Sequence, residues 1–163
     1  MLMKAIRLTV PRFDLDELSK FLYSTGEVAV INKIAINYFR CGQQQKAFDI
    51  YGQLLKLVLK RTPNHKYLLL IAYNYARHLV LEDRLEEALE ISEIGRKTCI
   101  KQEHYYLLPK FLHVEAECLY FTGRADKSKG FYRSAYYLYG AVGNRIDQEL
   151  LRIAAEKRLN LVF

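Results

Sequence analysis

One layout of residues is written three times along this chain, at intervals of 40 and 41 residues. The interval holds in three separate registers, which are Ala35, Ala76 and Ala116; Gly42, Asp83 and Gly123; and Ala47, Ala88 and Ser128. Self-similarity at a fixed period of this size is typical of arrays in which one helical hairpin is stacked on the next. The agreement of three registers therefore predicts an all-α chain, folded as a right-handed superhelical stack of helical hairpins.

Each unit contains two stretches with apolar residues at helical spacing, joined at the glycine or aspartate. Small residues at the first and third registers let the paired helices approach closely. The chain begins with a stretch that looks like a remnant second helix, with Ala5 at its crossing, followed by a linking helix capped by Asp14. The expected parts are the remnant plus linking helix at 1–25, repeats at 27–62, 66–102 and 107–141, and a capping helix at 145–163. Pro63 marks one expected junction.

Charge and composition exclude several classes of protein. The net charge of +7 is spread along the chain, so a specific nucleic-acid surface is not indicated. No apolar run reaches the roughly 18 residues that a membrane span needs, and no signal peptide is visible. Cys41, Cys99 and Cys118 lie inside helical patterns, which favours buried free thiols and a cytoplasmic location.

Motifs for catalysis or cofactor binding are absent from the sequence. His113 and Glu117 are four residues apart and could form half of a metal site. A second half is not evident, and such a pair also occurs as an ordinary contact on one helix face. We therefore expect no catalytic residues, no metal and no cofactor.

The small residue, the turn glycine, and the later alanine and tyrosine together resemble tetratricopeptide (TPR) repeats. The usual TPR period is about 34 residues, so the units here are longer. The signature tryptophan is replaced by Ile31, Ala72 and Leu112. HEAT and armadillo repeats have a similar period, but they explain the Gly42, Ala47 and Tyr51 pattern less well.

More narrowly, "INKIAINYFRCGQQQKAFDIYGQLL" and "GRADKSKGFYRSAYYLYGAVGN" resemble the C-terminal part of helix-turn-helix (XRE-type) transcriptional regulators of Firmicutes. The Rgg, PlcR, NprR and PrgX peptide-responsive regulators represent this family. The resemblance implies a ligand-sensing, dimerising domain that acts on DNA only through an N-terminal helix-turn-helix domain, which this sequence lacks. A homodimer through the C-terminal half is also implied, and the apolar residues of 145–163 support it.

First helices line the inner, concave face of such arrays, and this face is the expected binding surface. A peptide backbone could be bound by asparagine amides, a carboxylate by arginine, and apolar side chains by aromatic rings. The expected peptide-binding residues are Asn32, Ile36, Phe39, Tyr73, Asn74, Arg77, His113, Glu117 and Tyr120. The alternative function is a TPR scaffold or adaptor module with a partner protein in the same groove.

Overall fold

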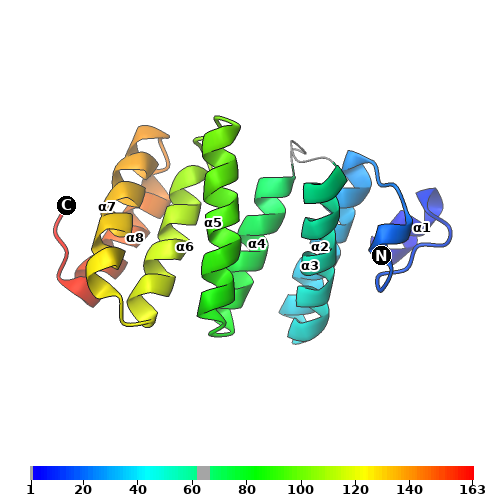
Figure 1. Cartoon of the computed structure of the whole chain (residues 1–163), viewed down its shortest axis with the longest axis horizontal. Coiled ribbons are helices and arrows are strands. Elements are labelled where there is room, and N and C mark those ends of the chain that lie inside the picture. The colour runs from blue at the N-terminus through cyan, green and yellow to red at the C-terminus, as the bar shows by residue number, and fades with distance from the viewer. Residues whose placement is uncertain (1, 62–66) are drawn as a thin grey trace. The chain divides into compact units, whose positions relative to one another are not determined.

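The computed structural model describes residues 2–61 and 67–163, and these residues form helices without any strand. The elements, which can be followed along the chain in Figure 1, are α1 (Leu2–Thr9), the 3-10 helix η1 (Leu18–Lys20), α2 (Thr25–Arg40), α3 (Gln44–Arg61), α4 (Leu68–Leu81), α5 (Leu85–Lys101), α6 (Leu108–Phe121), α7 (Ala125–Ala141) and α8 (Arg145–Leu159). The all-α prediction is confirmed. The junction expected at Pro63, with the boundaries at 62 and 66, lies outside the described residues.

The chain forms two compact units, Met1–Tyr75 and Ala76–Phe163. In the first unit, α2 and α3 pair as a hairpin. Helix α2 begins with a capping box, in which the Ser24 hydroxyl accepts from the Glu27 amide and the Glu27 carboxylate accepts from the Ser24 amide. In the second unit, α5 packs on α6, α6 on α7 and α7 on α8.

The repeated small residues lie at the helix crossings. Ala35, Ala76, Ala116, Ala47, Ala88 and Ser128 are all fully buried, as are the residues one turn after the third register, Tyr51, Ser92 and Tyr132. The buried serines also satisfy their hydroxyls, because Ser92 Oγ donates to the Phe111 carbonyl at 2.9 Å and Ser128 Oγ to the Ala116 carbonyl at 2.7 Å. Each serine thus joins two helices by packing and by a hydrogen bond.

The turn between the paired helices has the same backbone conformation in all three repeats. Gly42, Asp83 and Gly123 have φ of 75°, 57° and 76°, in the left-handed region that glycine adopts at least cost. Aspartate tolerates this region better than most side chains. The second repeat therefore keeps the turn although it has aspartate in place of glycine.

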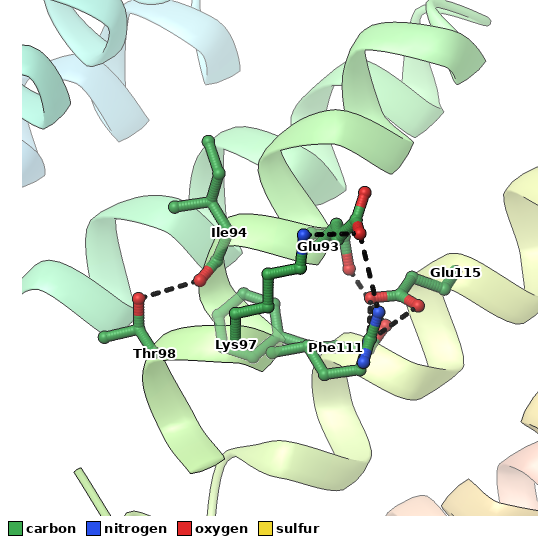
Figure 2. Close-up of polar contacts among 8 residues, drawn as sticks. Glu93, Ile94, Lys97, Thr98, Phe111 and Glu115 are labelled. Atoms are coloured by element: carbon green, nitrogen blue, oxygen red, sulfur yellow. Dashed lines mark hydrogen bonds and ion pairs between the residues drawn. The ribbon is translucent and has the colours of Figure 1, made fainter. Parts of the chain in front are cut away.

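The interface of α5 and α6 is cross-linked by charge. Arg96 Nε on α5 lies 2.9 and 3.0 Å from the two carboxylate oxygens of buried Glu115 on α6. Figure 2 shows the polar contacts of Glu115 and, on α5, the contact between Glu93 and Lys97. The ion pair of Glu93 with Lys97 has a length of 2.8 Å. Burial raises the pKa of Glu115, and the hydrogen bond from Arg96 opposes this rise.

The segment before α2 differs from expectation. The linking helix predicted after Asp14 is wrong, because Asp14 Oδ1 instead accepts from the Asp16 amide, a local turn that competes with a helix. Only the short η1 follows. Ala5 is exposed and the buried residue of α1 is Ile6, so Ala5 does not sit at a crossing.

The cysteines are free thiols in two environments. Burial raises the pKa of Cys99 and of Cys118 to about 12, so both are protonated at neutral pH. Cys41 is the exposed C-cap of α2, so the prediction of a buried thiol is wrong there. Within the part of the chain that the structure describes, no helix has the length and apolar character to cross a membrane.

Candidate functional site

The second unit gathers charged side chains from three helices around Glu117. Arg77 Nη1 from α4 donates to Glu117 Oε2, and Arg158 Nη1 from α8 donates to Glu117 Oε1 at 3.0 Å. Arg158 Nη1 also donates to the Tyr132 hydroxyl of α7 at 2.7 Å. One buried carboxylate is therefore shared by two guanidinium groups, which leaves the cluster with a positive surplus.

Glu117 is held as a carboxylate. Its side chain is only 10% exposed, and burial on its own would raise its pKa. The charges of His113, Arg77 and Arg158 more than reverse this effect, so the pKa of Glu117 lies below its usual value. Glu117 is consequently a fixed negative charge that orients both arginines.

His113 lies one turn before Glu117, in contact with aromatic rings. Its ring centre is 6.0 Å from that of Tyr132 and 6.2 Å from that of Tyr139. Burial lowers the pKa of His113, against the opposing charge of Glu117. Its Nε2 is buried and has no hydrogen-bond partner among the described residues. Its ring therefore contributes packing and shape to the cluster.

Tyr120 completes the expected residues of this unit. Its ring contacts that of Phe121 edge to face at 5.2 Å, and the Arg158 guanidinium carbon lies 5.9 Å from its ring centre. The same carbon is 4.9 Å from the ring centre of Phe121. Aromatic faces thus support the guanidinium group on one side.

The first unit brings together a pair of asparagines. Asn74 Nδ2 on α4 donates to Asn32 Oδ1 on α2 at 3.4 Å, a long hydrogen bond, and Asn32 is buried. Ile36 and Tyr73 are half-buried, and the Phe39 ring lies 6.0 Å from Phe48 of α3, so Phe39 also packs the hairpin. Amides arranged in this way have capacity left to bind a peptide backbone.

The expected residues therefore fall into two groups, one in each unit. Asn32, Ile36, Phe39, Tyr73 and Asn74 belong to the first unit, whereas Arg77, His113, Glu117 and Tyr120 belong to the second. Sequence reasoning missed Arg158. It lies 41 residues after Glu117, which is the repeat period itself, and that spacing is a signal that could have identified it.

The chemistry of both groups suits binding. Across residues 2–61 and 67–163, no cluster of three histidine, cysteine, aspartate or glutamate side chains is placed to hold a metal ion. The titratable groups around Glu117 are engaged with one another, as amides are around Asn32. What they offer a ligand is hydrogen-bond donors, positive charge and aromatic surface.

Comparison with known families and structures gives two results. Residues 14–160 match the family described as the RNPP family C-terminal domain. The solved structure of Bacillus thuringiensis PlcR in complex with the peptide PapR7 and DNA superposes with a TM-score of 0.73 at 20% sequence identity, over 89% of this chain and 56% of that one. The present chain thus spans little more than half of the PlcR chain. A search of curated proteins found no match.

Proposed function

The chain belongs to the family of RNPP C-terminal domains, and on that premise we propose that it is the peptide-sensing and dimerising domain of a bacterial transcriptional regulator. The family match over residues 14–160 is the observation that carries this proposal. The fold shared with PlcR, whose structure contains a peptide and DNA, supports it. Binding of DNA falls to a separate helix-turn-helix domain, and the work of such a regulator takes place in the cytoplasm.

The asparagine pair supports a peptide as the ligand. A peptide in extended conformation presents unpaired amide and carbonyl groups, and leaving these unpaired when they are buried is costly. Asn32 and Asn74 lie on the first helices of successive hairpins and are joined only by a long bond. We propose that both turn toward the peptide backbone when it binds.

The test is selection of ligands from a random heptapeptide library on the immobilised chain, followed by calorimetry with the enriched peptides. Replacing Asn74 by alanine should remove a hydrogen bond worth about 0.5–1.5 kcal/mol, which weakens binding roughly 2- to 12-fold. Gln45→Ala is the matched control, because this exposed amide donates to Asp49 on its own helix. No enriched peptide, or equal affinity in both variants, would contradict the proposal and favour a partner protein as the occupant.

Dimerisation is assigned to α8. Ile146, Leu150 and Ile153 are 76%, 59% and 50% exposed, and their spacing puts them on one face of the helix. An apolar stripe of this kind is the usual mark of a contact surface. We expect sedimentation to show a dimer that Leu150→Gln with Ile153→Gln weakens at least tenfold. Leu22→Gln, at an 82% exposed leucine of the first unit, should leave it unchanged, and a monomeric parent would refute the assignment.

A further inference from the structure

A pocket of about 370 Å³ lies between α6 and α8 in the second unit. Among the described residues, its lining combines apolar side chains with two cations and no carboxylate; these residues are Tyr120, Leu150, Ile153, Ala154, Lys157 and Arg158. Only Tyr120 of these was expected to bind a ligand. The composition suits a small ligand with an apolar part and a negative charge.

Arg158 lines this pocket, and one edge of its guanidinium group is not used in the bonds to Glu117 and Tyr132. Its Nη1 is occupied by Glu117 and Tyr132. Its Nε and Nη2 make no hydrogen bond with any residue that the structure describes. These two groups form one edge of the planar guanidinium, and that edge matches a carboxylate with two parallel hydrogen bonds.

The guanidinium group is also fixed in orientation before any ligand arrives. Glu117 and Tyr132 hold one corner, and the rings of Tyr120 and Phe121 lie within 6 Å of its carbon. Arg77, the residue first expected to bind a carboxylate, already donates to Glu117. Arg158 is therefore the better placed of the two arginines, because it can bind a second anion without giving up the first.

We infer that this pocket binds a carboxylate that is attached to an apolar group, with Nε and Nη2 of Arg158 as its two donors. Lys157 adds a second positive charge at the pocket wall, and Leu150, Ile153 and the Tyr120 ring cover the apolar part. Resting on the proposed function, the ligand group is the C-terminal residue of a peptide whose last side chain is apolar.

The experiment is an NMR titration of the whole chain with acetyl-Leu-Phe as the free acid and as the C-terminal amide. The free acid should shift the methyl signals of Leu150 and Ile153 and the Nε–H signal of Arg158 in a saturable way. The amide should bind at least tenfold more weakly, because it lacks the charge that the guanidinium edge binds. The titration is run at low protein concentration, because Leu150 and Ile153 also belong to the apolar stripe that is assigned to the dimer contact. A dimer would shift their signals without any ligand.

Variants of Arg158 separate the effect of its two parallel hydrogen-bond donors from the effect of its positive charge. Arg158→Gln should abolish the preference for the free acid, and Arg158→Lys should keep part of it, since lysine retains charge without the fork. Arg152→Gln is the matched control on the same helix, because Arg152 is engaged by Glu149 and Glu156 and does not line the pocket. Amide spectra of each variant establish that it is folded.

Each outcome has a defined meaning. Equal binding of acid and amide, or an unchanged preference in Arg158→Gln, overturns the inference. If library peptides bind at Asn74 and the acid does not bind at Arg158, the proposed function stands and this inference fails. If the acid binds but no library peptide does, the pocket stands and the proposed function fails. Tighter binding of octanoate than of the dipeptide would overturn the assignment to a peptide.

Discussion

Gly95 on α5 faces the ring of Phe111 on α6, and we predict that replacing it by alanine destabilises the second unit. A Cβ atom at this position would overlap Cε1 and Cζ of the ring and lie 2.6 Å from Cδ1. Phe111 is fully buried, and its carbonyl accepts the Ser92 hydroxyl, so neither ring nor backbone can move aside freely. The close approach of α5 and α6 thus depends on the missing side chain.

The magnitude follows from two opposing effects. Alanine improves helix propensity by about 1 kcal/mol over glycine. Overpacking of a dense core costs typically 1–3 kcal/mol, and the overlap with a fixed aromatic ring places Gly95 at the upper end of that range. The expected net loss is about 2 kcal/mol. For a chain of this size that corresponds to a fall in Tm of roughly 4–8 °C.

The assay is urea unfolding followed by circular dichroism, with Gly130→Ala as the matched control. A Cβ at Gly130, in the middle of α7, meets no heavy atom within 4 Å, so the same substitution should stabilise by about 1 kcal/mol. Replacing the Phe111 ring by the smaller leucine side chain should recover part of the lost stability in the Gly95→Ala background. If Gly95→Ala proves as stable as the parent, the described packing of α5 on α6 is refuted.

Three further predictions concern the turns, the crossings and pH. Asp83→Gly should stabilise by about 0.5–1 kcal/mol because it removes a side chain from the left-handed region, and Gly42→Asp should show the reverse in the same unfolding assay. Ala88→Leu should cost about 1–3 kcal/mol by overpacking a fully buried crossing, measured by thermal melts. For His113, the buried ring has a lowered pKa, so below the ordinary value of 6.5 the unfolded chain binds a proton that the folded chain does not. Stability should therefore fall as pH drops from 6.5 to 5.5, and His113→Phe should flatten that fall; an equal slope in both proteins would contradict it.

The repeat could be predicted from the sequence because equivalent packing positions require the same type of residue in each repeat. Ala47, Ala88 and Ser128 meet the same spatial demand, so each copy keeps a small residue there and each is fully buried. The turn was predictable for a similar reason. Even Asp83, which is not glycine, was placed correctly by the register and adopts a positive φ.

Other features could not be predicted because they depend on which partner a side chain finds. Asp14 has the spacing of a helix cap, but its carboxylate accepts from the nearby Asp16 amide, and only the short η1 follows. Arg77 has the chemistry to bind a ligand carboxylate, but it already donates a hydrogen bond to Glu117 on another helix. Periodicity indicates which face a residue occupies, whereas partner choice among charged side chains is settled in three dimensions.

In the second unit, helix α8 packs on α7. The buried residues of α8 itself are Leu151 and Ala155, so we expect this helix to open locally without unfolding α5 or α6. Amide hydrogens of α8 should therefore exchange with solvent sooner than those of α6. Arg158 links α8 to buried Glu117, so a carboxylate bound to Arg158 should slow exchange in α8 above all. Ligand binding in the pocket would then protect from hydrogen exchange the same helix to which dimerisation is assigned.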